Sequence, residues 1–350
     1  MLVGGGDTLL GEIREQPEAL RRMIAVSGEI GEAAAEAARR GVRHVRLVAH
    51  GTSDNAASYG VYALGLLPGW TAFRDSISLT VYYGARIDLR DSCVVGLSQS
   101  GETPDVVEYV RRARAGGAYT VAVSNDPASS LAGAAEGHLP LQAGSEHAIA
   151  ATKTYTSQLA ALALFAAHLA GAGDRYADGV LEAADLLEEA LPALERQVGE
   201  LATAFAFVGR LFAIGRGTDY ATAREISLKL LETCRVAAEP LTATDMVHGP
   251  VAALDRMFPV WAIVSDDEAI PPVGEAVARA RAAGATVVAS GTNAGAIEGD
   301  YRLPVPRPSL PLLAPLLTVV PGQLFAWALA RAKGLDPDRP AGLTKITRAS

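Results

Sequence analysis

Short runs rich in β-branched residues alternate with longer helical patterns along the chain, and this alternation restricts the fold more than any other feature. Strands that are separated by helices favour a parallel sheet with helices on both faces. The strands expected in the first half are 44–49, 78–83, 93–97, 119–124 and a weaker 139–142. Those expected in the second half are 210–214, 258–264, 285–289 and 301–304. The pattern therefore predicts an α/β protein with parallel sheets.

Helical patterns fill the intervals between these strands. In the first half they cover 8–28, 29–40, a stretch with Ala56, Tyr59 and Val61 after the turn "HGTSDN", 104–115 and 151–170. A charged helical stretch, 174–206, leads to a second cycle with helices at 220–234, 270–283 and 312–333. The segment "LVAHGTSDNAASYG" of the first cycle matches "FAIGRGTDYATARE" of the second as an apolar run, small residues, Thr, Asp and a helix. We therefore predict two doubly wound, three-layer units of flavodoxin-like architecture in tandem.

The length of 350 residues is sufficient for two cores. The expected boundaries are an N-terminal helical segment 1–35, a first unit 36–172, a helical linker 173–200, a second unit 201–335 and a C-terminal tail 336–350.

Composition excludes several classes of protein. The formal net charge is −8 and no basic cluster is present, so nucleic acid is not an expected partner. No signal peptide is expected, because the start "MLVGGGDTLLGEIREQ" has no basic region followed by an apolar one. No membrane span is expected, because the apolar window "PLLAPLLTVVPGQLFAWALA" is interrupted by Pro315, Pro321 and Gln323. The two cysteines, Cys93 and Cys234, form no paired motif, which is typical of the cytoplasm. The histidines lack metal-ligand spacing and no nucleotide fingerprint follows a strand, so neither a metal nor a cofactor is expected.

The stretch "LSQSGETPD", Leu97–Asp105, places small hydroxyl residues between a buried strand and a helix. Thr103 occupies an N-cap position and is followed by a proline, which favours the first turn of a helix. Ligands of open α/β sheets bind at the carboxyl ends of strands, where helix N-termini attract anions. The hydroxyls of Ser98, Ser100 and Thr103, with Gln99 beside them, can therefore bind a phosphate. Ordinary capped turns use the same residue types, so local chemistry leaves both interpretations open.

Two further segments refine this prediction. "HGTSDN" follows the strand 44–49, so Thr52 and Ser53 can reach the same crevice. The matching strand of the second half, 258–264, is followed by Ser265–Glu268, whose three carboxylates would repel a phosphate. We therefore expect one phosphate clamp in each chain, formed by Ser53 and residues 98–103.

The helix 220–234 places Glu225, Lys229 and Glu232 on one face, at i, i+4 and i+7. In an isolated helix this pattern is typical of a solvated face with an ordinary ion pair.

His248 and Lys345 lie outside the expected helices. His248 precedes Gly249-Pro250, which stiffens the loop, so it can serve in acid–base chemistry or have no such role. Lys345 lies in the proline-rich tail, where lysines are usually exposed.

Several segments taken together resemble one known family. They are "GTS", "LSQSGETPD", "AGSEHAIAATKTYTSQLAAL", "GRGTDYATAREISLKLLE", "VHGP" and "DPDRPAGLTKITRAS". In this order, from "EIREQP" near residue 12 to the C-terminus, the chain is similar to the sugar isomerase (SIS) domains, in particular to the isomerase half of glutamine–fructose-6-phosphate aminotransferase. The resemblance implies two SIS subdomains and a homodimer whose active sites are shared between subunits.

The resemblance also implies roles for individual residues. Glu232 matches the base that moves a proton between C1 and C2 of the open-chain sugar. His248 matches a ring-opening residue that the neighbouring subunit supplies. Lys345 matches the lysine that engages the sugar carbonyl, and Lys229 matches a nearby active-site lysine. The residues that match contacts to the sugar or its phosphate are Ser53, Ser98, Gln99, Ser100, Thr103, Ile149, Ala151 and Thr344.

The resemblance implies an enzyme and leaves its reaction open. The chain begins at the isomerase-like segment without an N-terminal nucleophilic cysteine, so we expect no glutamine hydrolysis. The expected reaction converts glucosamine 6-phosphate to fructose 6-phosphate and ammonia, as in the SIS-type glucosamine-6-phosphate deaminases.

Two alternatives to this reaction remain. Because "RVAAEPLTATD" departs from the family pattern, a phosphosugar aldose–ketose isomerase, or a fructosamine- or galactosamine-6-phosphate deaminase, is the first alternative. A non-catalytic sugar-phosphate sensor is the second, although such proteins normally join a DNA-binding domain to a single SIS unit.

Overall fold

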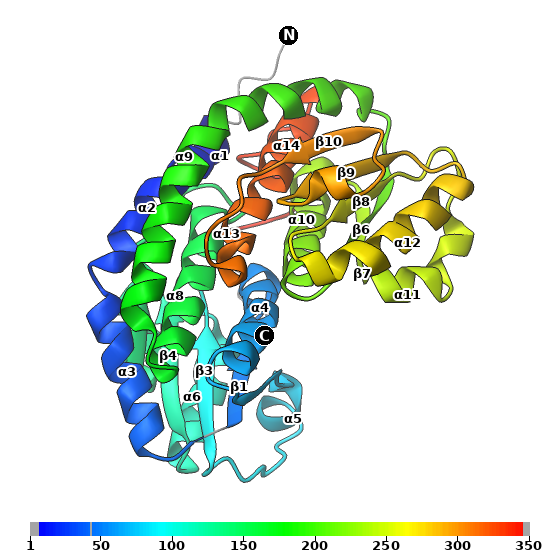
Figure 1. The fold of residues 1–350 in the computed structure, drawn as a ribbon. Coiled ribbons are helices and arrows are strands. Elements are labelled where there is room, and N and C mark those ends of the chain that lie inside the picture. Colours follow the sequence, from blue (N-terminus) through cyan, green and yellow to red (C-terminus); the bar gives the residue numbers. More distant parts are fainter. Residues whose placement is uncertain (1–6, 43, 346–350) are drawn as a thin grey trace. The chain divides into compact units, whose positions relative to one another are not determined.

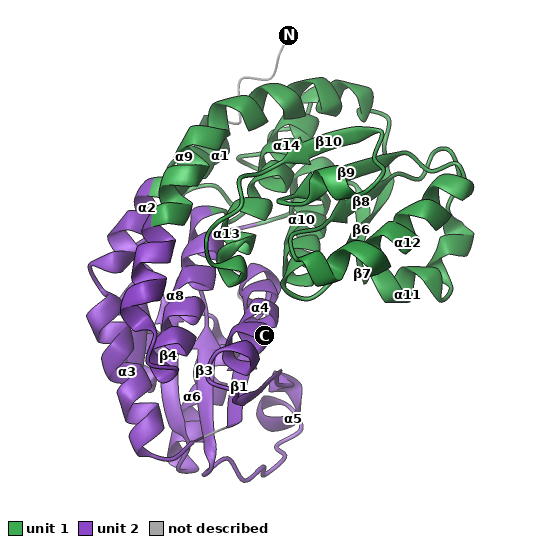
Figure 2. Cartoon of the chain, in the orientation of Figure 1, with its two compact units in different colours: residues 1–17, 147–152, 182–343 green, residues 18–146, 153–181, 344–350 purple. Residues whose placement is uncertain are grey.

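The computed structural model describes residues 7–42 and 44–345. The chain divides into two compact units, which have different colours in Figure 2. Unit 1 comprises Met1–Pro17, His147–Thr152 and Glu182–Leu343, and unit 2 comprises Glu18–Glu146, Lys153–Leu181 and Thr344–Ser350. Each unit therefore collects segments that are far apart in the sequence.

Unit 2 is built around a five-stranded parallel sheet (Figure 1). Its strands are β1 (His44–Val48), β2 (Thr71–Arg74), β3 (Ser92–Leu97), β4 (Tyr119–Ser124) and β5 (Gly137–Pro140), in the spatial order β2-β1-β3-β4-β5. The central strands β3 and β4 are buried along their whole length, as expected where helices cover both faces of a sheet. The helices of this unit are α3 (Ser27–Arg39), α4 (Gly51–Leu66), α5 (Ile77–Val81), α6 (Pro104–Ala115), α7 (Ser130–Ala134) and α8 (Lys153–Leu169).

Unit 1 repeats this topology. Its strands are β6 (Arg210–Gly215), β7 (Ala237–Thr242), β8 (Val260–Ile263), β9 (Val287–Gly291) and β10 (Tyr301–Pro304), in the order β10-β9-β8-β6-β7. The helices of this unit are α1 (Asp7–Arg14), α10 (Thr218–Cys234), α11 (Ala243–Val247), α12 (Ile270–Ala282), α13 (Pro315–Thr318) and α14 (Val320–Ala332). Numbered within each unit, both sheets have the strand order 2-1-3-4-5, so the predicted tandem of doubly wound, flavodoxin-like units is confirmed.

Two helices contain residues of both units, α2 (Gln16–Ile24) and α9 (Gly173–Ala204). The single N-terminal helix predicted over 8–28 is wrong, because α1 ends at Arg14 and α2 begins at Gln16. Pro17 explains the break. Proline fits the first turn of a helix but interrupts the hydrogen bonds of a helix interior.

The predicted strands also differ from the observed ones. The strand predicted over 78–83 is wrong, since this segment forms α5 and leaves Tyr82 and Tyr83 exposed, while β2 pairs with β1. Conversely, neither β2 nor β7 was predicted; in β7, Glu239 and Pro240 argue against a strand. β7 lies at the edge of its sheet, where a proline without an N–H group is tolerated.

The helical run Pro311–Ala332 is long and apolar enough to cross a membrane by length and composition alone, with an 18-residue window of mean hydropathy 1.7. However, 94% of that window is buried inside the protein. Gly322 of α14 approaches Ile226 of α10 so closely that a Cβ atom would lie 2.2 Å from the isoleucine side chain. The run is therefore a core element of unit 1.

Candidate active site

The residues of the predicted phosphate clamp lie at the point in unit 2 where the strand order reverses. β1 and β3 are neighbours in the sheet, and α4 and α6 are the helices that follow them along the chain. Ser53 lies in the first turn of α4, and residues 98–103 form the turn that leads into α6. Doubly wound proteins bind their ligands at this edge, outside the carboxyl ends of the strands.

The side chains of the 98–103 turn hold one another. The hydroxyls of Ser98 and Thr103 are 2.8 Å apart and hydrogen-bonded, and the Gly101 N–H donates to Ser98 Oγ at 3.1 Å. Thr103 is the N-cap residue of α6, as predicted. Gly101 has φ +70°, and a Cβ atom there would lie 2.2 Å from the hydroxyl of Ser129. The turn is therefore preorganised, and only glycine fits at position 101.

Ser53 is buried and accepts a hydrogen bond from Gln158 Nε2 at 2.8 Å. Gln158 belongs to α8 and is itself buried. Sequence reasoning missed Gln158, although it lies within the quoted segment "AGSEHAIAATKTYTSQLAAL". A neutral amide thus orients Ser53 without adding charge to the clamp.

The carboxylates near the turn are already engaged within unit 2. Glu102 accepts hydrogen bonds from the backbone N–H and the hydroxyl of Ser130, at 2.8 and 2.7 Å. These bonds hold the pKa of the Glu102 carboxyl below its usual range. Asp105 lies 2.6 Å from His50 Nε2. Both acidic groups therefore have protein partners at this edge.

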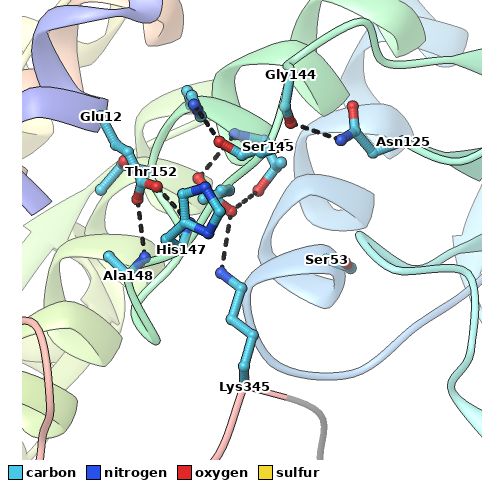
Figure 3. Close-up of polar contacts among 12 residues, drawn as sticks. Glu12, Ser53, Asn125, Gly144, Ser145, His147, Ala148, Thr152 and Lys345 are labelled. Carbon is cyan, nitrogen blue, oxygen red and sulfur yellow. Dashed lines mark hydrogen bonds and ion pairs between the residues drawn. The ribbon is translucent and has the colours of Figure 1, made fainter. Parts of the chain in front are cut away.

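Lys345 forms an ion pair with Glu146 at 3.5 Å, which Figure 3 shows as a dashed line. The Glu146 side chain is fully buried and also accepts from the N–H and hydroxyl of Thr154, at 3.2 and 2.6 Å. The expectation of an ordinary exposed terminal lysine is therefore wrong, because Lys345 has a specific buried partner. Thr344, next to it, is exposed. Sequence reasoning also missed Glu146.

Ile149 and Ala151 lie in the loop 147–152, which belongs to unit 1. Both are half-buried, and the loop is neither helix nor strand. Its first two backbone N–H groups, those of His147 and Ala148, donate to the carboxylate of Glu12.

The acidic and basic residues of α10 are buried rather than solvated. Lys229 has an exposed fraction of 2% and Glu225 of 0%, so the interpretation as a solvated helix face is wrong. Lys229 Nζ lies 2.6 Å from Glu232 and 3.4 Å from Glu225. A buried ammonium group needs such partners, since removing one typically costs about 3–5 kcal/mol.

Glu232 is the accessible member of this group, with 23% of its side chain exposed. It lines a cavity of about 400 Å³ in unit 1, together with Thr233, Arg235, Arg339 and Leu343. A carboxylate that is oriented by a buried lysine and open to a cavity can accept a proton from a bound molecule.

His248 follows α11 and is exposed. It lines a different cavity of unit 1, of about 330 Å³, with Thr244, Pro272 and Arg279. Within the chain, His248 and Glu232 therefore line separate cavities. The prediction that a neighbouring subunit supplies His248 remains a prediction.

Unit 1 has its own reversal of strand order, between β6 and β8, and here a carboxylate takes the place of a ligand. Asp219, in the first turn of α10, accepts hydrogen bonds from the backbone N–H and the hydroxyl of Ser265, at 2.7 and 2.8 Å. Its exposed fraction is 0%, and this burial raises the pKa of the Asp219 carboxyl to about 7. The two donors of Ser265 at this edge are therefore already occupied by Asp219.

Comparison with known proteins supports the resemblance. The SIS domain model matches residues 40–168 and 205–327. Glutamine–fructose-6-phosphate aminotransferase (isomerizing) from Symbiobacterium thermophilum is 36% identical over 358 residues, which cover 96% of this chain and 58% of that protein. The chain thus spans little more than half the length of such relatives.

Two solved structures extend the comparison. The C-terminal domain of glucosamine-fructose-6-phosphate aminotransferase from Francisella tularensis has a TM-score of 0.88 at 28% identity, covering 96% of this chain and 99% of that one. A candidate phosphosugar isomerase from Silicibacter pomeroyi has a TM-score of 0.85 at 34% identity, covering 95% and 99%. Since the family model matches both sheets with most of their surrounding helices, this chain belongs to the SIS domain family.

Proposed function

We propose that this protein is an amino-sugar-phosphate isomerase and deaminase that converts glucosamine 6-phosphate and water to fructose 6-phosphate and ammonia. The observation that carries the proposal is Glu232, a carboxylate oriented by the buried Lys229 and open to a cavity. Membership of the SIS family supports an isomerase-type reaction on a phosphosugar.

In the proposed reaction the sugar ring first opens to give an aldehyde at C1 beside the C2 amine. Glu232 removes the C2 proton and returns it to C1, while the C1 oxygen gains a proton and the amine nitrogen loses one; the aldehyde and amine become a hydroxymethyl group and a C2 imine. Water then hydrolyses the imine to the ketone and releases ammonia. One carboxylate is sufficient for both proton transfers, because it is a base before the first and an acid before the second.

The clamp is proposed to bind the phosphate through Ser53, Ser98, Ser100 and Thr103, at the N-terminus of α6. Preorganised hydroxyls and the helix dipole favour an anion there without a buried positive charge. Gln99, Ile149, Ala151 and Thr344 are proposed to contact the sugar. The clamp and Glu232 must act on one substrate for the proposal to hold.

Lys345 and His248 complete the proposed chemistry. Lys345, whose ammonium group pairs with Glu146, is proposed to stabilise negative charge that develops on the carbonyl oxygen. His248 is proposed to open the sugar ring in the partner of a homodimer, since it does not share the cavity of Glu232. A cytoplasmic location suits this metabolic role.

A phosphosugar aldose–ketose isomerase is the second candidate. It is favoured by the 34% identity to the Silicibacter pomeroyi protein, of which the match covers 99%. The same base and clamp would serve it, with a hydroxyl group in place of the C2 amine and no hydrolysis.

The deciding experiment incubates the purified protein with glucosamine 6-phosphate and measures ammonium and fructose 6-phosphate together. Both products are expected in equal amounts. Glu232→Gln should lower kcat by roughly 100- to 10,000-fold while KM changes little, because the amide keeps the shape but cannot take a proton. Glu298→Gln, an exposed carboxylate of unit 1, is the matched control.

Two outcomes would revise the proposal. Interconversion of aldose and ketose phosphates without ammonium would favour the second candidate. Full activity of Glu232→Gln would remove Glu232 as the base.

A further inference from the structure

We infer that Glu12 and Gln16 are positioning residues: they hold the loop 147–152 at its two ends and thereby place Ile149 and Ala151 for contact with the sugar. The inference rests on the proposed function, because it takes this loop as part of the sugar site. It gives a role to the N-terminal segment "EIREQP", to which the proposed chemistry assigns none. All the residues concerned belong to unit 1.

Glu12 holds the first end of the loop. It lies in α1 and has an exposed fraction of only 4%. Its two carboxylate oxygens accept hydrogen bonds from the backbone N–H groups of His147 and Ala148, the second at 3.1 Å (Figure 3). Hydrogen bonds to a buried carboxylate are stronger than those between neutral groups, so this end of the loop is firmly fixed.

Two hydrogen-bonded side-chain amides, both buried, connect α2 with the other end of the loop at Thr152. Gln16 Nε2 donates to Gln323 Oε1 at 2.8 Å and to the carbonyl oxygen of Ile13 at 3.0 Å. Gln323 Nε2 in turn donates to the carbonyl oxygen of Thr152 at 3.5 Å. Gln16, Gln323 and Thr152 are all buried. The same short N-terminal segment therefore reaches both ends of the loop.

The loop needs these partners because it has no secondary structure of its own. Buried backbone N–H and C=O groups that lack a partner are costly, and a loop cannot satisfy them through a regular ladder. Ala148, Ala150 and Thr152 are buried, whereas Ile149 and Ala151 are half-buried. Fixing 147, 148 and 152 thus leaves the stretch between them with one defined backbone path.

A purely structural role for Glu12 makes a different prediction from a positioning role. If Glu12 only stabilised unit 1, its replacement would lower Tm and leave the affinity of the folded protein unchanged. If it positions the loop, its replacement raises KM and the Kd for the sugar phosphate in protein that is still folded, while kcat changes little.

The experiment measures KM and kcat with glucosamine 6-phosphate, the Kd for fructose 6-phosphate by calorimetry, and Tm, in wild type and Glu12→Gln. Glutamine keeps one acceptor oxygen and replaces the other by an amide group that cannot accept from an N–H. KM and Kd should rise about tenfold, as for the loss of one charge-assisted hydrogen bond. Glu12→Asp, which keeps both oxygens on a shorter side chain, should recover part of the affinity.

Glu182→Gln is the matched control. Glu182 is a carboxylate of the same unit that accepts from the backbone N–H of Ser309 at 3.1 Å. Its replacement should leave KM and Kd at the wild-type values. Gln323→Met removes the hydrogen bonds that link Gln16 to Thr152 at the other end of the loop, and it should cause the same rise in KM and Kd. This variant replaces Glu12→Gln in the experiment if Glu12→Gln does not fold.

The results separate this inference from the proposed function. Wild-type protein that binds fructose 6-phosphate but releases no ammonium would contradict the proposed reaction, and the Kd values would still decide the role of Glu12. A lower Tm with unchanged Kd in both Glu12→Gln and Gln323→Met would overturn the inference. Failure of the wild type to bind the sugar phosphate would overturn both.

Discussion

The two units share a topology but treat the same edge of the sheet in opposite ways. In unit 2 the motif "GTS" places Ser53 after β1, and Ser98 follows β3. In unit 1 the matching motif "GTD" places Asp219 after β6, and Ser265 follows β8. Ser53 is held by a neutral amide, whereas Asp219 itself occupies the donors of Ser265.

This difference shows what the fold provides and what individual residues decide. The reversal of strand order brings hydrogen-bond donors to the sheet edge in both units. Whether an outside anion can use them depends on one position, which is a serine in one unit and an aspartate in the other. An internal carboxylate satisfies the donors permanently, at the cost of burying an acidic group.

The largest expected effect comes from placing an aspartate at the sheet edge of unit 2, as is found at the matching edge of unit 1. Ser53→Asp should lower kcat/KM for glucosamine 6-phosphate by roughly 100- to 1,000-fold, because a carboxylate close to the phosphate adds repulsion of about 4 kcal/mol. Steady-state kinetics with a parallel Tm measurement check this. Ser53→Ala, which only removes the hydroxyl, should lose about tenfold or less. If Ser53→Asp stayed within a few fold of wild type, the edge of unit 2 would not bind the phosphate.

The second prediction concerns the pH dependence of stability that Asp219 introduces. The pKa of Asp219 in the folded protein is raised to about 7, so the folded protein favours the neutral form of this carboxyl group more than the unfolded chain does. This contribution is fully present below about pH 4, the range of an unfolded aspartate, and is lost as the pH rises through about 7. Asp219→Asn does not titrate, and its amide can donate to the Ser265 hydroxyl while its oxygen accepts the backbone N–H. The variant should therefore gain roughly 2–4 kcal/mol relative to wild type between about pH 5 and pH 8.

Urea unfolding across this pH range measures the difference, with the exposed Asp178→Asn as control. A parallel pH dependence of wild type and Asp219→Asn would show that Asp219 stays ionised in the folded protein at all these pH values. Asp219 would then carry a full negative charge at the edge of unit 1, as a bound anion would, despite its burial.

The sequence predicted the turn and the helix start of the proposed clamp correctly, because the required information is local. A buried run, small hydroxyl residues, an N-cap threonine and a proline follow one another between Leu97 and Pro104, and the observed α6 begins at Pro104. The parallel order of both sheets was also predictable from the alternation of strands and helices. By contrast, the β-branched residues near Tyr82 suggested a strand where the chain forms the short helix α5, because the sequence does not show which side chains pack inside.

The residues that were missed have partners far away in the sequence. Gln158 contacts Ser53 across 105 positions, and Glu146 pairs with Lys345 in the tail. No local pattern distinguishes these residues from ordinary polar positions. The burial of Lys229 is a similar case, since its spacing from Glu225 and Glu232 is the same on a solvated helix and on a buried one. Tertiary packing decides between the two, and the sequence of one helix does not contain it.

The smallest expected effect comes from removing one hydroxyl at each of the two edges, that of Ser100 in the clamp of unit 2 and that of Ser265 in unit 1. Ser100 is half-buried, and within the turn its hydroxyl accepts the Glu102 N–H at 3.2 Å, whereas Ser98 is buried and bonded to Thr103. Ser100→Ala should therefore preserve the turn and raise KM about three- to tenfold, the usual value of one hydrogen bond to an anion, with kcat unchanged. Ser265→Ala, which leaves Asp219 without one donor, should lower Tm and leave KM alone. If Ser265→Ala raised KM and Ser100→Ala did not, the phosphate would bind at the edge of unit 1, and the assignment of the two edges would have to be exchanged.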